Sequence, residues 1–280
     1  MFGKVKGNRS GNQQSISKKN KKELKAQRKW EQDEERIKGS KFRLLNEYMY
    51  TVNSEEAQKH FKKNPEEFKI YHTGYAQQIE KWPESPVGNI IKLLTESEQF
   101  SNKKLVVCDL GCGQGEIQEH FQNDKRLSKL ITVKSFDLVA IKPYIIETDI
   151  SNLPLDDCSC DVAIFSLSLM GINYLDYLGE AFRVLKKNGH LIIAEVKSRM
   201  NTIDNFVNLV TGMGMKILKR DEHNSHFVLF VFEKVMDVCQ FNGPLNQKRV
   251  YQILGQKDPN LKDWQSLGQQ ILQPCVYKKR

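Results

Sequence analysis

The residues with the clearest capacity for chemistry form a glycine loop near the middle of the chain. An apolar run at 105–108 is followed by Asp109 and by three alternating glycines, Gly111, Gly113 and Gly115. The apolar run predicts a buried strand, and residues 115–122 predict a helix. Because glycine has no Cβ and tolerates positive φ, a ligand can approach the backbone closely at the start of that helix. The stretch therefore predicts a pocket in which backbone contacts a ligand.

The spacing of these glycines separates two classes of cofactor. A dinucleotide-binding loop has Gly-x-Gly-x-x-Gly, which would place its third glycine at position 116, where this chain has Glu116. The observed Asp-x-Gly-x-Gly-x-Gly resembles motif I of the class I methyltransferases, whose cofactor is S-adenosylmethionine. That resemblance implies cofactor contacts at Asp109, Gly111 and Gly113. The alternative is a tight glycine turn that binds no ligand.

Two aspartates follow the strands predicted after the glycine loop. In open α/β sheets, ligands bind beyond the carboxyl ends of the strands, so these positions are candidates for ligand contacts. Asp137 ends the second predicted strand, where a carboxylate can accept hydrogen bonds from both hydroxyls of a ribose. Asp149 follows the third, where it can accept from an adenine amine, with Ile150 against the ring. Either aspartate can instead cap a turn, as Asp commonly does.

The fourth predicted strand runs into residues 165–171, beside which a methyl acceptor is expected to lie. Enzymes that methylate exocyclic amines of bases commonly carry Asn/Asp/Ser-Pro-Pro-aromatic at this place, and residues 165–171 contain no proline. Methylation at carbon 5 of pyrimidines requires a cysteine nucleophile, but Cys158 and Cys160 precede the strand. Both reactions are therefore disfavoured, and no residue is identified as a catalytic acid or base.

The histidines form no pattern typical of a metal site. His72 lies on a predicted helix without an obvious ligand partner, so the residues alone leave it unassigned. His223 and His226 flank a predicted hairpin, again without partners that suggest metal. We expect no metal site.

Strands and helices alternate from residue 104 onward. The patterns predict strands at 104–109, 132–136, 144–147, 160–165, 189–196, 215–221 and 225–234, with helices near 115–122, 174–186 and 202–211. Such alternation implies a mainly parallel sheet with helices on its faces. Residues 222–224 suit a tight reversal, so the last strand is expected to run antiparallel. The expected fold is α/β: a class I, Rossmann-like methyltransferase with a seven-stranded sheet, an antiparallel terminal hairpin strand and a small helical cap in front.

One predicted connection is too short for an ordinary crossover. Only six residues, including Pro143, separate Asp137 from Tyr144. Parallel strands are usually joined by a dozen residues or more, because the chain must return along the length of the sheet. We therefore expect an irregular loop there, without a helix.

The positive charge of the chain is concentrated at its N-terminus. Of the formal net charge of +9, residues 1–43 carry 14 Lys and Arg against 5 Asp and Glu, which leaves 29 of each elsewhere. A concentrated basic segment suits phosphate backbones and is typical of nuclear or nucleolar targeting. No apolar run approaches the ~20 residues that span a bilayer, so no membrane partner is expected.

Composition divides the chain into four predicted segments. Residues 1–40 form a basic arm, disordered or conditionally helical, and residues 41–100 form the helical cap. Within the cap, Asn64-Pro65 and Ser85-Pro86 mark helix starts. Residues 101–236 form the domain expected to bind S-adenosylmethionine. Residues 237–280 form a C-terminal extension that is expected to pack against the domain.

A set of short motifs shows a more specific resemblance. The set comprises Phe42-Arg-Leu-Leu-Asn-Glu47, Tyr50-Thr51, Ser54-Glu-Glu-Ala57, Tyr71-His-Thr-Gly-Tyr75, Trp82-Pro83, Pro86-Val87, Asp109-Leu-Gly-Cys-Gly113, Phe136-Asp-Leu138, Ser166-Leu-Ser-Leu-Met-Gly171 and Asn224-Ser-His-Phe227. From about Lys41 to Lys234 the chain resembles the ribosomal RNA-processing protein 8 family, also called nucleomethylin in animals. Residues 1–40 share only their basic character with that family, and residues after 237 are expected to extend beyond its usual end.

The family resemblance implies a particular set of cofactor contacts. These are His72, Gly111, Asp137, Asp149, Ile150 and Ser166. His72, which the residues alone left unassigned, thereby becomes a predicted contact. Two positions depart from the commonest family residues, because Met often stands in place of Ile150 and Cys in place of Ser166.

The resemblance also implies a reaction, a location and a partner. Members of the family are nucleolar methyltransferases that make 1-methyladenosine in large-subunit ribosomal RNA, so the expected partner is ribosomal RNA or a pre-ribosomal particle, in the nucleus and nucleolus. The basic arm, with Lys197 and Arg199 after the fifth predicted strand, is expected to contact phosphates. Two alternatives stay open: a methyltransferase acting on another RNA or on protein, and a non-catalytic, cofactor-binding scaffold at ribosomal DNA chromatin.

Overall fold

A seven-stranded sheet forms the centre of the computed structural model, which describes residues 10–236 and 264–275. The strands are β1 (Leu105–Leu110), β2 (Ile131–Asp137), β3 (Ile145–Glu147), β4 (Cys160–Ser166), β5 (Leu185–Val196), β6 (Met215–Asp221) and β7 (Phe227–Lys234). Their order is β3-β2-β1-β4-β5-β7-β6. Strands from β3 to β5 run parallel, whereas β7 runs antiparallel to β5 and β6. The predicted α/β fold with its reversed last strand is confirmed.

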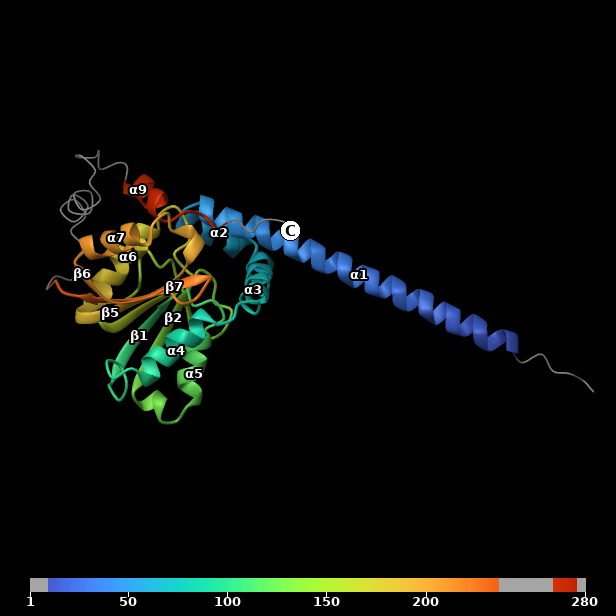
Figure 1. Cartoon of the computed structure of the whole chain (residues 1–280), viewed down its shortest axis with the longest axis horizontal. Helices are drawn as coiled ribbons and strands as arrows, with labels where there is room; N and C mark the ends of the chain where they lie inside the picture. Colours follow the sequence, from blue (N-terminus) through green and yellow to red (C-terminus); the bar gives the residue numbers. More distant parts are fainter. Residues whose placement is uncertain (1–9, 237–263, 276–280) are drawn as a thin grey trace, which may run out of the picture.

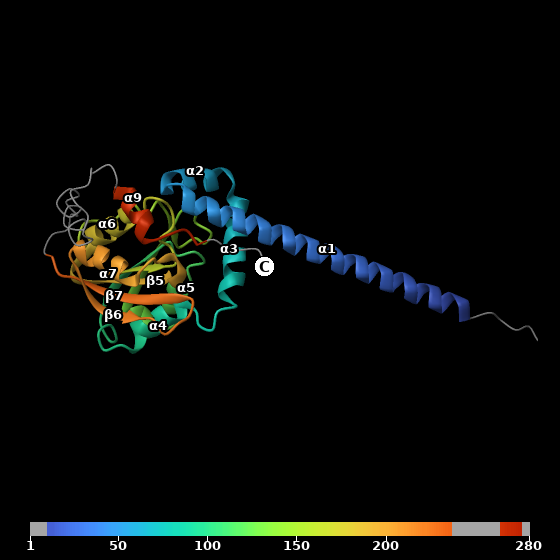
Figure 2. The same cartoon turned by 45° about the horizontal axis from the view of Figure 1, so that its top comes forward.

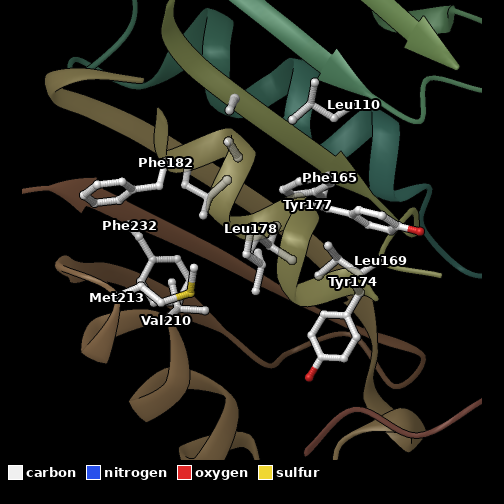
Figure 3. Close-up of a cluster of buried hydrophobic side chains, with 14 of the residues drawn as sticks. Leu110, Phe165, Leu169, Tyr174, Tyr177, Leu178, Phe182, Val210, Met213 and Phe232 are labelled. Atoms are coloured by element: carbon white, nitrogen blue, oxygen red, sulfur yellow. The ribbon is translucent and has the colours of Figure 1, made fainter. Parts of the chain in front are cut away.

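Helices cover both faces of the sheet, because the central strands are buried on both sides. β4 and β5 contain long runs of buried residues, as is typical of central parallel strands. α6 (Tyr174–Val184) and α7 (Ile203–Gly212) pack on one face, where Phe182, Val210 and Phe232 lie in one cluster (Figure 3). α5 (Glu116–Asn123) packs on the other face. The core of the protein is therefore two apolar layers separated by the sheet.

The connection between β2 and β3 has no helix, as predicted. Residues 138–144 form bends and turns only. Tyr144 from this loop packs against the glycine loop, and a Cβ at Gly115 would lie 2.8 Å from its ring. Lys142 forms an ion pair with Glu119 of α5 at 2.5 Å. These contacts hold the short loop against the start of α5.

Three helices at the N-terminal side form the cap: α1 (Ser10–Thr51), α2 (Ser54–Lys63) and α3 (Pro65–Ile79). Asn53 caps α2, because its side chain accepts a hydrogen bond from the Glu56 N–H. Pro65 begins α3, at the position where a missing N–H is tolerated. Phe42, Phe61 and Phe68 of the cap are buried together in a core of their own.

The fourth N-terminal helix differs from the prediction. α4 (Pro86–Glu96) was expected in the cap, but its buried residues Ile90 and Leu94 pack with Val107 of β1 and Ile192 of β5. α4 is therefore part of the helical layer on the sheet, beside α5. The physical reason is the apolar character of one face of α4, which the sheet buries.

α1 is a single helix of 42 residues. It begins at Ser10 and continues past residue 40, so the predicted boundary between the arm and the cap lies inside a helix. Its C-terminal part packs in the cap, and its N-terminal part projects from the body (Figures 1 and 2). None of the helices in residues 10–236 and 264–275 combines the length and apolarity needed to cross a membrane.

The C-terminal segment packs against the domain, as predicted for residues 264–275. α9 (Trp264–Ile271) lies on α6, and the Tyr174 hydroxyl donates a hydrogen bond to the Gly268 carbonyl at 2.7 Å. The Asn46 side chain of α1 donates to the Cys275 carbonyl at 2.8 Å. The segment thus links α6 to the cap. Residues 237–263 and 276–280 of the predicted extension lie outside the described residues.

Candidate functional site

A cavity of about 470 Å³ lies at the C-terminal ends of the central strands, beside α3. It is lined by seven of the eight predicted contact residues: His72, Asp109, Gly111, Gly113, Asp137, Ile150 and Ser166. These residues come from α3, from the ends of β1, β2 and β4, and from the segment after β3. Because β1 lies between β2 and β4 in the sheet, the parallel order brings their carboxyl ends to one edge.

The glycine loop after β1 turns sharply with all three glycines at positive φ. The φ angles are 75° at Gly111, 56° at Gly113 and 70° at Gly115. The Gly111 and Cys112 N–H groups both donate to the Phe136 carbonyl of β2, at 2.9 and 3.0 Å. A Cβ at Gly111 would lie 2.5 Å from the Cβ of Ser168, so a larger residue cannot fit there. The sequence pattern therefore reflects both backbone conformation and close packing.

Asp137 at the end of β2 fixes the loop from the side. Its carboxylate accepts hydrogen bonds at 2.7 Å from the Gly113 N–H and from the Leu138 N–H. The side chain is buried, and this burial raises its pKa to about 6 despite the two backbone donors. Each oxygen has a second lone pair, so the carboxylate can still accept from a ligand.

Asp109 at the end of β1 is the most perturbed acid in the cavity. Burial, with smaller contributions from Asp137 and Glu116, raises its pKa to about 8. Its Oδ1 atom is buried and has no hydrogen-bond partner among the residues that the structure describes. A buried polar atom without a partner is unfavourable, so Asp109 is poised to accept a ligand donor or to stabilise a ligand cation.

His72 and Ser166 also bring polar atoms without protein partners to the cavity. His72 Nε2 and Ser166 Oγ are both buried and unpaired within the described residues. The His72 ring is held edge-on against Phe68 of α3, with centroids 4.3 Å apart. Burial lowers the pKa of His72 to about 4, so its imidazole is neutral near pH 7. A neutral imidazole can donate one hydrogen bond and accept another.

Asp149 is the predicted contact that the structure does not bring to the cavity lining. Its carboxylate accepts a hydrogen bond from the Ser151 N–H at 2.9 Å, and its carbonyl accepts from the Asn152 N–H at 3.0 Å. These bonds are those of a turn-forming aspartate. The cofactor role of Asp149 stays a prediction, whereas its neighbour Ile150 lines the cavity.

Arg199, expected to contact phosphate, is instead fully buried. Its side chain is 1% exposed and pairs at 2.7 Å with Glu195, which is 0% exposed. Its Nε donates to the Gln273 carbonyl at 2.7 Å, and its guanidinium lies 4.5 Å from the centre of the Tyr50 ring. The prediction for Arg199 is therefore wrong, because the C-terminal segment and the cap cover it.

The lining of the cavity carries carboxylates and no described cation. Its acidic residues are Glu80, Glu84, Asp109, Glu116 and Asp137, and the lining contains no Lys or Arg. Sequence reasoning missed Glu80, Glu84 and the aromatic Trp82, which also line it. The only signal for Trp82 was its place in a family motif. Among the described residues, no group of three or more His, Cys, Asp or Glu side chains is arranged to hold a metal ion.

This chemistry suits a positively charged nucleoside cofactor. S-adenosylmethionine carries a sulfonium, an ammonium group, ribose hydroxyl donors and a carboxylate. The acidic lining matches its cations, and the unpaired buried atoms of His72, Asp109 and Ser166 offer hydrogen-bonding partners. Together with the strand order and the glycine loop after β1, these features define a class I, S-adenosylmethionine-dependent methyltransferase.

Comparisons with known proteins place the chain within this class. A family model described as "Hypothetical methyltransferase" matches residues 28–280. The chain is 41% identical to "Ribosomal RNA-processing protein 8" of Dictyostelium discoideum, covering 88% of this chain and 58% of that protein. It is 41% identical to the Arabidopsis thaliana protein of the same name, covering 88% and 76%. It is 40% identical to "25S rRNA (adenine(645)-N(1))-methyltransferase" of Schizosaccharomyces pombe, covering 72% and 64%.

The chain belongs to the ribosomal RNA-processing protein 8 family. It spans between about half and three quarters of the length of the relatives that it matches, for example 47% of the mouse protein and 76% of the Arabidopsis protein. The family match runs to residue 280, so the expectation that residues after 237 lie beyond the family's usual end is wrong.

Cofactor affinity is expected to fall as the pH drops through the pKa of Asp137. Its folded pKa of about 6 means that the carboxylate, the form that accepts ligand hydrogen bonds, is lost below that pH. We expect the Kd for S-adenosylmethionine to rise roughly tenfold between pH 7 and pH 5, by linkage. Calorimetric titration over this range measures it. The Asp137→Asn variant should bind weakly at every pH without that step, and a constant Kd in the parent protein would contradict the assignment.

Proposed function

We propose that this chain is an S-adenosylmethionine-dependent ribosomal RNA methyltransferase that forms 1-methyladenosine in large-subunit ribosomal RNA during ribosome biogenesis. The relative in Schizosaccharomyces pombe, named as a 25S rRNA (adenine-N1)-methyltransferase, supports the substrate and the atom. That relationship also supports action in the nucleus and nucleolus. The cofactor contacts in this proposal are His72, Asp109, Gly111, Gly113, Asp137, Asp149, Ile150 and Ser166.

The observation that carries the proposal is the acidic, cation-free lining of the cavity. The bound cofactor supplies an electrophilic methyl group on a positively charged sulfur. Transfer to a ring nitrogen forms an N–C bond as the S–C bond breaks, and the positive charge passes to the base. Near pH 7 Asp137, with a pKa of about 6, is ionised, whereas Asp109, with a pKa of about 8, ionises in response to a cation bound beside it. One unit of positive charge therefore lies in the cavity lined by these two acids before and after transfer. Methylation that ends in proton loss would remove that charge.

A ring nitrogen as the acceptor also needs no general base, because no proton has to leave it before it attacks. Adenine N1 carries a free lone pair, so the protein has to hold reactants at about 3–3.5 Å rather than remove a proton. His72 is neutral with a pKa of about 4, which makes it a weak base. Burial and the nearby Asp137 and Asp109 raise the pKa of the Cys112 thiol well above its usual value, so Cys112 is a poor nucleophile. Positioning and charge therefore account for the chemistry.

Labelled cofactor and unmodified large-subunit ribosomal RNA test this function. We expect one adenine to become 1-methyladenosine, identified by nucleoside analysis, and the product to disappear in Asp137→Ala. Two results would overturn the proposal. Label appearing in protein or in another RNA position would indicate a different acceptor. Tight cofactor binding without transfer to naked RNA or to pre-ribosomal particles would indicate a non-catalytic scaffold.

The proposed RNA contact includes the basic arm, of which α1 carries most. Lys25, Lys29, Arg36 and Arg43 follow one another at intervals of four and seven residues, which places them within about 40° of each other around the helix. The row is about 27 Å long. Within the described residues, Lys25, Lys29 and Arg43 make no ion pair with a carboxylate, and Arg36 only a long one to Asp33 at 3.9 Å.

Two cations outside this row are paired with acids. Lys38 contacts Glu34 at 2.7 Å, and Lys41 contacts Glu67 at 3.1 Å. The row on one face of α1 therefore offers phosphates more available charge than these two paired lysines do. Since the cavity itself is acidic, this separation lets the RNA backbone bind at a distance while the target base enters the site.

Neutralising the row should weaken RNA binding more than neutralising paired cations of the same helix. We expect Lys25→Gln/Lys29→Gln to reduce the slope of log K against log salt by about 1.5 to 2, because two phosphate contacts are lost. Filter binding to a 20-base-pair RNA duplex measures it. The matched variant Lys38→Gln/Lys41→Gln removes the same charge and should change the slope little. Equal slopes for the two variants would contradict a role for the row.

A further inference from the structure

The cavity extends to the β4 side of the glycine loop, where Ser166 is the one predicted cofactor contact that comes from β4. Asp137 and Ile150 mark the half on the β2 and β3 side of the glycine loop. On the opposite side of β1, the lining includes Leu167 directly after β4, Ile79 at the end of α3, and Trp82 in the connection between α3 and α4. This half is apolar and aromatic. A cofactor whose nucleoside end contacts β2 leaves the β4 side for the methyl acceptor.

Trp82 is held in place by the β6–β7 hairpin. Its ring stacks on His226 at 5.0 Å with an interplanar angle of 27°, and on Phe227 at 6.0 Å and 16°. The hairpin is itself anchored, because Lys197 N–H donates to the His226 carbonyl at 2.8 Å. Trp82 is half-buried and also lines the cavity. The contacts with His226 and Phe227 therefore fix the position of the indole before any ligand binds.

The end of β4 in the same half is a backbone position of unusual conformation. Leu167 has φ of 57°, a left-handed conformation that side chains other than glycine rarely adopt. Its N–H donates to the Ala194 carbonyl of β5 at 2.9 Å, and its side chain is buried. Such strained residues gather at ligand sites, where the surrounding structure holds them. Leu167 and the indole of Trp82 line the same cavity.

We propose that this half of the cavity is the acceptor-base subsite, and that Trp82 is the positioning residue on which the extruded purine stacks while its ring nitrogen faces the methyl donor. The subsite rests on the proposed function for the identity of the base. Stacking on an aromatic face is the common way in which proteins hold an unpaired base. Glu80 and Glu84 at the exposed rim add negative charge where the base acquires its positive charge.

Fluorescence of Trp82 provides the direct test. The chain has three tryptophans, so the Trp30→Phe/Trp264→Phe variant leaves Trp82 as the sole indole. With the cofactor site saturated by S-adenosylhomocysteine, a five-nucleotide RNA with a central adenine should quench its emission. The same RNA with an abasic centre should not. Equal quenching by both RNAs, or none by either, would overturn the subsite.

Kinetics separate stacking from a merely structural role. We expect Trp82→Ala to lower kcat/KM for ribosomal RNA roughly 10- to 100-fold, the range that corresponds to one lost base stack, with the Kd for S-adenosylmethionine unchanged. Trp82→Phe should restore most of the rate, because it keeps an aromatic face. Leu218→Ala removes an exposed apolar side chain from β6, away from the arm and the cavity, and serves as the control. Full activity of Trp82→Ala would overturn the role of Trp82 in holding the base. If the adenine-containing RNA quenches the Trp82 emission but no methyl group is transferred, the subsite is upheld and the proposed reaction is overturned.

Discussion

Replacing Asp137 by alanine is expected to weaken S-adenosylmethionine binding by about 100-fold or more and to abolish methyl transfer at ordinary cofactor concentrations. Asp137 holds the glycine loop through the Gly113 N–H and supplies the carboxylate at the end of β2. Hydrogen bonds to a charged group contribute about 1.5–3 kcal/mol each. The loss of two such bonds to a ribose therefore corresponds to a rise in Kd of about 100-fold or more. Calorimetric titration and a methylation assay measure the two losses.

Asp137→Asn distinguishes lost binding from lost folding. The folded pKa of Asp137, about 6, lies above its ordinary value of 3.8, so its contribution to folding stability is fully present below about pH 4 and is lost as the pH rises through 6. At pH 7.5 the ionised group therefore opposes folding. Asp137→Asn removes the cost of the buried charge but keeps only one of the two oxygens that accept from the Gly113 and Leu138 N–H groups, so these effects oppose each other. We therefore expect the variant to remain folded without cofactor at this pH while binding cofactor poorly. Normal binding by Asp137→Asn would contradict the role given to its charge.

Asp149→Ala is the natural comparison at the next strand end. Because its carboxylate caps a turn and is absent from the lining, we expect a smaller loss of affinity than for Asp137→Ala. The same titration ranks the two variants. A larger effect at Asp149 would show that the segment after β3 moves its carboxylate to the cofactor on binding.

Replacing Arg199 by alanine is expected to lower the free energy of unfolding by about 3–5 kcal/mol, because it leaves the Glu195 charge buried and unpaired. Glu195 is 0% exposed, and burial raises its pKa even with Arg199 beside it. The variant also loses the hydrogen bond to Gln273 and the contact with Tyr50, which join β5 to the C-terminal segment and to α1. Urea denaturation followed by circular dichroism measures the loss.

The neighbouring Lys197 provides a matched control for the buried pair. Its side chain is 38% exposed and lies 3.9 Å from a Glu222 carboxylate oxygen, so Lys197→Ala should change stability by less than about 1 kcal/mol. The double replacement Glu195→Leu/Arg199→Met should recover most of the loss, because it removes both charges together. If Arg199→Ala were no more destabilising than Lys197→Ala, the buried pair would not have the effect assigned to it.

Sequence patterns located the elements of the domain closely because their causes are local. β6 was predicted at 215–221 and is Met215–Asp221, and the irregular loop after Asp137 followed from a residue count alone. The boundaries of α1 and the place of α4 were less accurate. A highly charged sequence is compatible with coil or helix, and whether an apolar helix face packs in a cap or on a sheet depends on distant residues.

By itself, the sequence determined the class of the protein. It showed the alternating strands and helices, the glycine loop, and the acids Asp109 and Asp137 at strand ends. These features depend on neighbouring residues and on the 2.0- and 3.6-residue periods of strands and helices. Only the tertiary structure decided that Asp149 closes a turn, that Arg199 is buried against Glu195, and that Trp82 stacks on His226 and lines the cavity. The physical reason is that burial and charge pairing arise where segments far apart in the chain meet. Residues 264–275 cover Arg199, and a hairpin more than 140 positions after Trp82 holds its ring.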